Sequence, residues 1–366
     1  MLWSSAVLLL LGVGDNVTSV TTRPRKTVPH DTSTAEVDPH DPGQVEAGLA
    51  PRKAAAEVQV GRVPGLGHRS AGGLSSGRIE AVRHVYECPV RWADLDLLGH
   101  VNNVVYVDYL QEARVDMLLT HAPDSRSEDL AEGVVVVRHE VDYAAPLSFD
   151  FRTVRIESWV TEIRAATFTM AYEVFHEGAS GSRHVYARAR TVLTPYVFAS
   201  GRPRRITATE REALGRFLEP ASPTPRDQVL SPPRTPEAHY PVHVRFSDVD
   251  VYGHVNNVVY FEYLQEARIV LLSRLRGGFP GAQGVPLLVV AHTEVDYRVP
   301  ILFRPAPYDA WSAISRVGRT SAVIDHEICD ADTVLARARV VLVFIDPETQ
   351  RPVPVPDAVR EAGPGS

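Results

Sequence analysis

Two short stretches of this chain carry carboxylate, imidazole and amide side chains in one shared order. The two sets are Asp94, Asp96, Gly99, His100, Asn102 and Asn103, and Asp248, Asp250, Gly253, His254, Asn256 and Asn257. In each copy, a long apolar segment without Pro or Gly follows and predicts a helix. A carboxylate just before a helix lies where backbone N–H groups lack partners and the helix dipole is positive. The same helix start would hold a carbonyl oxygen that gathers negative charge, beside an acid able to activate water.

A structural alternative is that the acid only caps the helix. Capping needs one acidic residue, whereas each stretch keeps two acids, a Gly, a His and two Asn within ten positions. The sequence therefore predicts a catalytic role for Asp96 and Asp250, with capping as the alternative. His100 and His254 either hydrogen-bond the turn or contact or support the substrate, and the sequence leaves both roles open.

The chain contains an internal repeat. Gly99 to Arg114 returns 154 residues later as Gly253 to Arg268, and only two of these 16 positions differ, both conservatively. A length of 366 residues also suits about two domains. Whatever chemistry one copy has, the other is expected to share.

Apolar periodicity predicts the same elements in both copies. A strand at Arg83–Trp92, or Tyr240–Phe246, leads to a helix at Val101–Leu119, or His254–Leu275, which Gly277-Gly278 ends in the second copy. Because the helix is apolar around most of its circumference, we expect other structure to wrap it. Four strands follow, expected as an antiparallel meander: Val134–Tyr143, Arg152–Ile163, Thr167–His176 and Val185–Leu193, matched by Leu288–Tyr297, Tyr308–Val317, Ser321–Cys329 and Val334–Phe344.

Composition sets the expected domain bounds. Residues 1–79 are rich in Pro, Gly, Ser, Thr and charge and are expected to be a disordered extension. One domain is expected at 80–200 and a second at 237–350, with a loose Pro-rich tail at 351–366. The linker at 201–236 is expected to hold a short helix within Thr207–Leu218 and to let the two copies lie side by side.

Several classes of function find no support. A net charge of −7 offers no basic surface for nucleic acid. Cys88 and Cys329 fall at unmatched positions of the repeat, which disfavours a disulfide or metal site and fits thiols of a cytoplasmic protein. The apolar run Ala6–Val13 is too short to span a bilayer, although it leaves a secreted protein as an alternative. No serine-hydrolase elbow, phosphate loop or metal-type His spacing is present.

The repeated motif resembles a known family. Trp-Ala-Asp-Leu-Asp-Leu-Leu-Gly-His-Val-Asn-Asn and Phe-Ser-Asp-Val-Asp-Val-Tyr-Gly-His-Val-Asn-Asn are similar to the signature of hotdog-fold acyl-CoA thioesterases of the 4-hydroxybenzoyl-CoA thioesterase type. The resemblance implies an α+β fold of two tandem hotdog domains, each a long central helix wrapped by an antiparallel sheet, paired as a pseudo-dimer. It also implies hydrolysis of an acyl-CoA in lipid metabolism, with active sites between the halves. Coenzyme A would belong to the substrate, and no cofactor or metal would be needed.

The resemblance also assigns roles by position. Asp96 and Asp250 match the family's catalytic acid and would act as general base or nucleophile. The N–H groups from Gly99 to Asn103 and from Gly253 to Asn257 would polarise the thioester carbonyl and bind substrate. Leu98 and Tyr252 stand where plant acyl-carrier-protein thioesterases have Asn, and some bacterial relatives have His where this chain has Asn103 and Asn257.

Other repeated charges have alternative interpretations. Glu140/Glu294 and Asp142/Asp296 are expected on a solvated or paired strand face, and Glu112 with Arg114 in an ion pair or in packing. The pairs Arg188/Arg190 and Arg337/Arg339 form an exposed basic face or, less simply, contact coenzyme A phosphates. A non-catalytic acyl-CoA sensor and a hotdog hydratase or dehydratase with an Asp/His pair are the alternative functions. Acyl length, the CoA or protein carrier, and further homo-oligomers stay open.

Overall fold

The computed structural model describes residues 82–121, 133–178, 180–198, 200–222, 228–276 and 287–364. The extension expected to be disordered, residues 1–79, and the helix stop expected at Gly277-Gly278 lie outside these residues.

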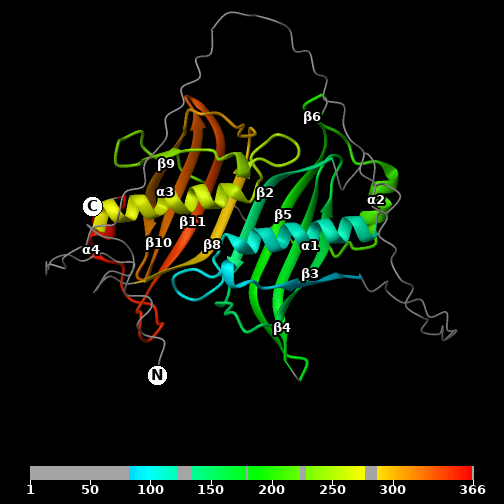
Figure 1. The fold of residues 1–366 in the computed structure, drawn as a ribbon, viewed down its shortest axis with the longest axis horizontal. Helices are drawn as coiled ribbons and strands as arrows, with labels where there is room; N and C mark the ends of the chain where they lie inside the picture. The colour runs from blue at the N-terminus through cyan, green and yellow to red at the C-terminus, as the bar shows by residue number, and fades with distance from the viewer. Residues whose placement is uncertain are drawn as a thin grey trace, which may run out of the picture. The chain divides into compact units, whose positions relative to one another are not determined.

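Both copies form the predicted kinds of element in the predicted order (Figure 1). The first copy consists of β1 (His84–Pro89), the short 3-10 helix η1 (Trp92–Asp94), α1 (Val105–His121), β2 (Val134–Tyr143), β3 (Thr153–Ile163), β4 (Phe168–Glu177) and β5 (Arg183–Val197). The second consists of β7 (His239–Val242), η3 (Phe246–Asp248), α3 (Val259–Arg276), β8 (Leu287–Tyr297), β9 (Tyr308–Val317), β10 (Ser321–Asp330) and β11 (Thr333–Ile345). Outside the repeat lie β6 (Arg202–Pro203), α2 (Ala208–Gly215) and α4 (Asp357–Glu361).

The strands form one antiparallel sheet in the order β1-β3-β4-β5-β2-β8-β11-β10-β9-β7, with β6 paired to β5. The predicted four-strand meander is wrong in one respect. Only β3, β4 and β5 follow each other as a meander, whereas β2 pairs with β5, and β1 occupies the place beside β3. Side-chain alternation identifies the residues of a strand, but the choice of neighbouring strand depends on the whole fold.

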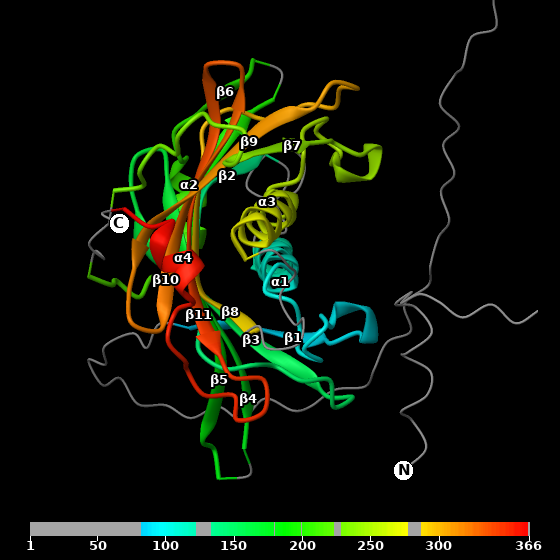
Figure 2. The same cartoon turned by 90° about the vertical axis from the view of Figure 1, so that its left-hand side faces the viewer.

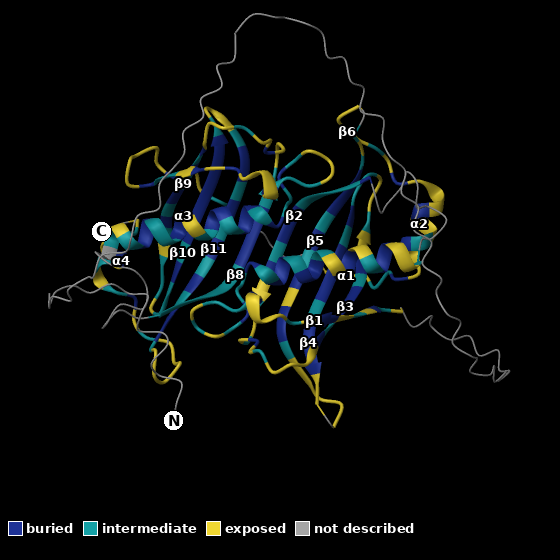
Figure 3. Cartoon of the chain, viewed as in Figure 1, coloured by how far each residue is buried: buried dark blue, intermediate teal, exposed yellow. Residues whose placement is uncertain are grey.

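The two long helices lie on the same face of this sheet (Figure 2). Helix α1 contacts β1 and β3, and α3 contacts β7 and β9. Buried residues recur every three or four positions along each helix, so dark segments alternate with teal and yellow ones in Figure 3. Val107 and Phe261, which match each other in the repeat, belong to one apolar core shared by both copies. The expected wrapping is incomplete, because Val115 of α1 is 39% exposed.

The C-terminal segment is not the loose tail that its composition predicts from residue 351. Helix α4 contacts α3, and Val355 and Val359 are 2% and 0% exposed in a core cluster with Leu271 and Leu272. Val355 lies just before α4 and Val359 lies within it, and the burial of these two side chains beside α3 outweighs the Pro-rich composition that suggested a loose chain.

The linker is also more ordered than a simple tether. The predicted short helix is confirmed as α2, where Thr207 and Glu210 form a capping box. Farther on, the Leu230 N–H donates to Asp325 at 2.8 Å and the Ser231 hydroxyl to Glu327 at 2.9 Å. Residues 228–231 therefore lie along the strands of the second copy.

The first acid of each repeated pair is structural. Asp94, 2% exposed, accepts hydrogen bonds from the Arg91 N–H at 2.8 Å and the Tyr109 hydroxyl at 2.5 Å. Asp248 accepts the matching bonds from Arg245 at 2.8 Å and Tyr263 at 2.6 Å. These bonds tie the turn before each helix to the first turns of the helix itself.

We expect Asp94→Asn to destabilise the protein in a pH-dependent way. Burial acts to raise the pKa of Asp94, but the hydrogen bonds from Arg91 and Tyr109 outweigh it and hold the pKa below its usual value. A lowered folded-state pKa adds stability above the unfolded-state pKa, and this stability is lost as the pH falls through the folded-state pKa. The variant should lose about 2 kcal/mol of unfolding free energy at pH 7, and the difference should shrink below about pH 4.

Urea unfolding of both proteins at several pH values measures this difference. Asp332→Asn, in the exposed turn between β10 and β11, is the control and should have little effect. An equal loss at pH 7 and pH 3 would contradict the stabilising charge.

We also expect Val359→Ala to lower the unfolding free energy by about 2 kcal/mol, because it opens a cavity beneath α4. Arg351→Ala, an exposed change in the same segment, is the matched control and should stay within about 0.5 kcal/mol of wild type. Equal stabilities of the two variants would mean that the segment does not pack in solution.

Candidate functional site

The repeated motif forms a closed turn rather than the first turn of a helix. Helices α1 and α3 begin at Val105 and Val259, later than the predicted Val101 and His254. In the first copy, the Asp96 N–H donates to the His100 carbonyl at 2.8 Å, and the Asn102 N–H donates to the Asp94 carbonyl at 2.9 Å. Gly99 and Gly253 have φ values of 73° and 80°, a left-handed conformation that glycine adopts without steric cost.

Asp96 and Asp250 are half-buried at this turn. One oxygen of Asp96 accepts the Leu98 N–H at 2.8 Å, and one oxygen of Asp250 accepts the Tyr252 N–H at 2.9 Å. Neither carboxylate caps a helix. The side chains of Asn102 and Asn256 do so instead, by accepting the N–H groups of Val104 and Val258, each at 3.1 Å. The capping alternative for Asp96 and Asp250 is therefore wrong, and the second oxygen of each accepts no hydrogen bond from the described residues.

Few backbone N–H groups near these acids remain available to a ligand. Donors to a ligand were expected throughout Gly99–Asn103, but Gly99, His100, Val101 and Asn102 donate to acceptors in the fold. Among the described residues, the Asn103 N–H donates to none. In the second copy, Gly253, Val255 and Asn256 also donate within the fold, and Asn257 again does not. The candidate oxyanion donor common to both copies is thus the N–H of Asn103 or Asn257.

A tyrosine hydroxyl donates a hydrogen bond to the backbone carbonyl of each of these asparagines. The Tyr143 hydroxyl donates to the Asn103 carbonyl at 2.8 Å, and the Tyr297 hydroxyl donates to the Asn257 carbonyl at 2.8 Å. Burial raises the pKa of both tyrosines, so they remain neutral donors. The sequence analysis gave these tyrosines no role, although their repetition 154 positions apart was a usable signal.

Contacts between the copies complete the site at the start of α3. His139 of β2 lies 3.1 Å from the Asn257 side-chain nitrogen, measured from its Nε2 atom. Phe198, which follows β5, stacks on Tyr252 with ring centroids 4.0 Å apart and also lies beside His254. Repetition could not point to His139 or Phe198, because the second copy does not keep these residue types: Thr293 stands where the first copy has His139.

The imidazoles of His100 and His254 make no hydrogen bond to the described residues. His100 is half-buried, and its backbone N–H reaches an Asp96 oxygen at 3.4 Å. The Asp/His pair that a hydratase or dehydratase would require is therefore not formed at this motif.

The other repeated charges form structural pairs. Arg138 bonds to Glu140 and Asp296, each at 2.7 Å, and also to Glu294, while His292 bonds to Asp142 at 2.7 Å. The expected paired strand face is thus confirmed. The basic side chains on the neighbouring strands are paired as well: Arg188 with Glu173, Arg337 with Glu327, and Arg339 with Asp325.

Glu112 and Arg114 form no ion pair. Glu112 is exposed, whereas Arg114 is 6% exposed and its Nη1 atom has no hydrogen-bond partner in the described chain. The counterpart of Arg114, Arg268, is 7% exposed, and burial lowers its pKa to about 10. Packing is the better of the two interpretations offered for this arginine.

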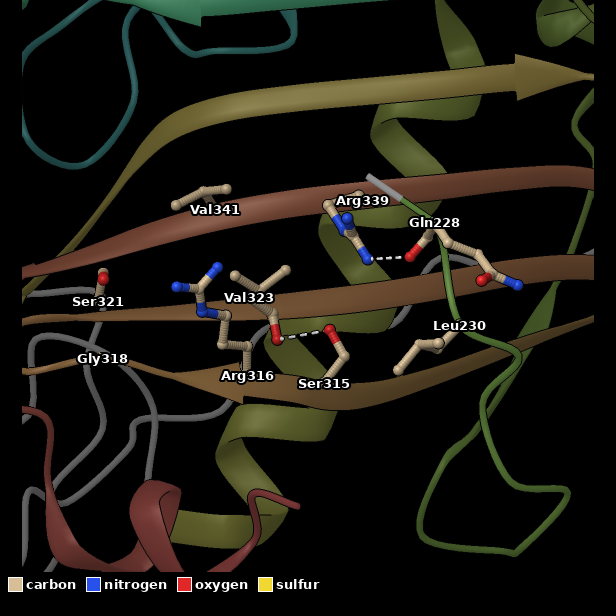
Figure 4. A pocket seen from close by; sticks show the side chains of 9 residues that line it. All are labelled: Gln228, Leu230, Ser315, Arg316, Gly318, Ser321, Val323, Arg339 and Val341. Carbon is tan, nitrogen blue, oxygen red and sulfur yellow. Dashed lines mark hydrogen bonds between the residues drawn. The ribbon is translucent and has the colours of Figure 1, made fainter. Parts of the chain in front are cut away.

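A pocket of about 490 Å³ lies away from the repeated motif, between the linker residues Gln228 and Leu230 and strands β9, β10 and β11 (Figure 4). Its lining residues Ser315, Arg339 and Val341 alternate along their strands with core residues that pack beside α3. The pocket therefore opens on the sheet face that points away from α3, and none of the motif residues lines it.

The described residues contain neither a cluster suited to a metal ion nor a helix suited to a membrane. No group of three or more His, Cys, Asp or Glu side chains in this part of the chain is arranged to hold a metal ion. No helix within the described ranges has the length and apolar character needed to cross a membrane.

Comparison with known sequences gives two matches that agree with the repeat. Residues 90–221 and 244–363 each match the family model of the thioesterase-like superfamily. YsmA of Bacillus subtilis (strain 168), an uncharacterized protein, is 31% identical over 125 residues, which are 33% of this chain and 80% of YsmA.

Solved structures share the fold at low identity. A proposed oleoyl thioesterase from Lactobacillus plantarum has a TM-score of 0.58 and 18% identity, with 73% of this chain and 98% of that chain covered. The 12:0-ACP thioesterase from Umbellularia californica has a TM-score of 0.56 and 16% identity, with 72% and 94% covered. Because the family model matches both copies and most of the described chain, this protein belongs to the thioesterase-like superfamily.

Proposed function

We propose that this protein hydrolyses an acyl thioester, with acyl-CoA as the expected substrate. The observation that carries the proposal is a pairing present in both copies. One oxygen of a half-buried carboxylate, Asp96 or Asp250, accepts no hydrogen bond from the described residues. In the same turn stands the backbone N–H of Asn103 or Asn257, which donates to none of these residues. Membership of the thioesterase-like superfamily supports the same chemistry.

The proposed reaction needs these two groups and water. The unoccupied oxygen of Asp96 or Asp250 takes a proton from water as the water oxygen bonds to the thioester carbon. The carbonyl electrons move to its oxygen, where the N–H of Asn103 or Asn257 donates to the developing negative charge. Collapse of this intermediate breaks the carbon–sulfur bond, and the protonated Asp returns its proton to the thiolate. Direct attack by the carboxylate through an anhydride is the alternative route.

We further propose that the two hotdog domains act as a pseudo-dimer with one site at the start of each long helix. The pairing of β2 with β8 and the contact of His139 with Asn257 support this arrangement. Coenzyme A and acyl-carrier protein are both candidate acyl carriers, because the Umbellularia californica relative is a 12:0-ACP thioesterase. The two free cysteines favour a cytoplasmic protein.

Thiol release from a panel of acyl-CoA and acyl-carrier-protein substrates tests the function. We expect Asp96→Asn and Asp250→Asn each to lower kcat partially, and the double variant to lose at least about 100-fold, because no base remains. A wild-type protein that binds acyl-CoA without releasing thiol would favour the sensor alternative.

Matched controls come from the repeat itself. Glu112→Gln and Glu266→Gln change a pair of exposed acids, one in each long helix, and should leave kcat within about twofold of wild type. Full activity in the Asp96→Asn/Asp250→Asn double variant would reject the proposed base.

The protein's own thiols should not react with the reagent that detects thiol release. Cys88 and Cys329 are 3% and 0% exposed, and burial raises the pKa of Cys88 to about 12 and also raises that of Cys329. We expect neither cysteine to react with an aromatic disulfide reagent at pH 8 until a denaturant is added, when both should react. Fast labelling of the native protein would contradict this burial.

A further inference from the structure

The two candidate sites differ in one buried contact. His139, on the helix-facing side of β2, is 0% exposed and lies between Thr191 of β5 and Asn257 at the start of α3. The matching residues of the second copy are Thr293 and Val340, so the His–Thr pair of the first copy becomes Thr–Val. This is a chemical difference between two sites whose motifs keep the same two Asp, Gly, His and two Asn residues.

The hydrogen bonds of His139 determine its protonation. Burial, together with the nearby charge of Arg114, lowers the pKa of His139 well below its usual value, so the ring is neutral. Its Nε2 atom, 3.1 Å from the Asn257 amide nitrogen, must then accept. Its Nδ1–H donates to the Thr191 hydroxyl oxygen at 3.0 Å. Asn257 is consequently held twice, by His139 at its side chain and by Tyr297 at its carbonyl.

Within the described residues, Asn103 at the start of α1 has one such hydrogen bond instead of two. Tyr143 bonds to its carbonyl, but its side chain makes no hydrogen bond to the described residues. The buried Thr293, which stands where His139 stands in the other copy, interacts with the side chain of Tyr143, and its hydroxyl makes no hydrogen bond to Asn103. A preorganised donor stabilises developing charge better than one that must be ordered during the reaction.

We propose that His139 is a positioning residue that fixes Asn257, and that the site at the start of α3 carries most of the turnover. The inference rests on the proposed function, because it concerns the N–H that would polarise the thioester carbonyl. His139 itself touches no reacting atom. It acts through Asn257, and it comes from the opposite copy.

Variants that isolate each site test the inference. Asp96→Asn leaves only the α3 site with its base, and Asp250→Asn leaves only the α1 site. Adding His139→Leu to Asp96→Asn should lower kcat about 10- to 100-fold with KM nearly unchanged. The reason is that the Asn257 N–H is no longer fixed in position, while substrate binding remains. Adding it to Asp250→Asn should leave the residual kcat unchanged. His139→Gln should restore much of kcat in the Asp96→Asn protein, because its side-chain oxygen can accept from Asn257.

A second variant protects the test against misfolding. Thr191→Val copies the residue of the other half, removes the partner of His139 Nδ1, and should lower kcat only in the Asp96→Asn protein. Thr333→Val, at the exposed first position of β11, is the control and should leave kcat unchanged in both single-site proteins. Thermal unfolding of every variant shows whether the fold is intact.

The outcomes separate the two proposals. If both single-site proteins lose kcat equally with His139→Leu and Thr191→Val, or if neither loses it, the positioning role is overturned. An asymmetric loss limited to the Asp96→Asn protein supports it. Full activity of the Asp96→Asn/Asp250→Asn double variant overturns the proposed function instead, whatever the His139 variants do.

Discussion

The pairing of β2 with β8 is the interaction on which the rest of the structure depends. Its register places Glu140 directly opposite Glu294, two like charges that would repel each other. Arg138, which is 4% exposed, forms ion pairs with both of these carboxylates and with Asp296. Its guanidinium offsets the repulsion by lying among the three carboxylates. Such a buried cluster adds little net stability, but a shift in strand register would separate the ion pairs and leave buried charges without partners. The cluster therefore fixes how the two copies meet.

The same register determines what lies on the helix-facing side of the sheet. His139 follows Arg138 and points the opposite way, toward Asn257 at the start of α3. Tyr143, four residues farther along β2, reaches the carbonyl of Asn103 at the start of α1. One strand thus supports both helix starts. A charge network on one face and the candidate sites on the other are two consequences of a single strand pairing.

Two neighbouring acids have different tasks because of small differences in environment. Asp94 is buried and saturated with hydrogen bonds from Arg91 and Tyr109, which suits a structural link. Asp96 is half-buried, and within the described part of the chain only one of its oxygens accepts hydrogen bonds. The left-handed Gly99 turns the chain back so that the structural acid, the half-buried acid and the helix start stay within one short loop.

The sequence by itself determined the duplicated unit, the kind and order of its elements, and the motif at the helix start. Alternation along a strand and apolar spacing along a helix follow from local backbone geometry, and the repeat is visible by comparing the two halves of the sequence. The tertiary structure alone decided that β2 lies beside β5 and that Val355 and Val359 are buried. It also decided which N–H groups of the turn donate hydrogen bonds within the fold. It also decided the contact between His139 and Asn257, residues 118 positions apart. The physical reason is that each of these features depends on which distant groups the folded chain brings within hydrogen-bonding or packing distance.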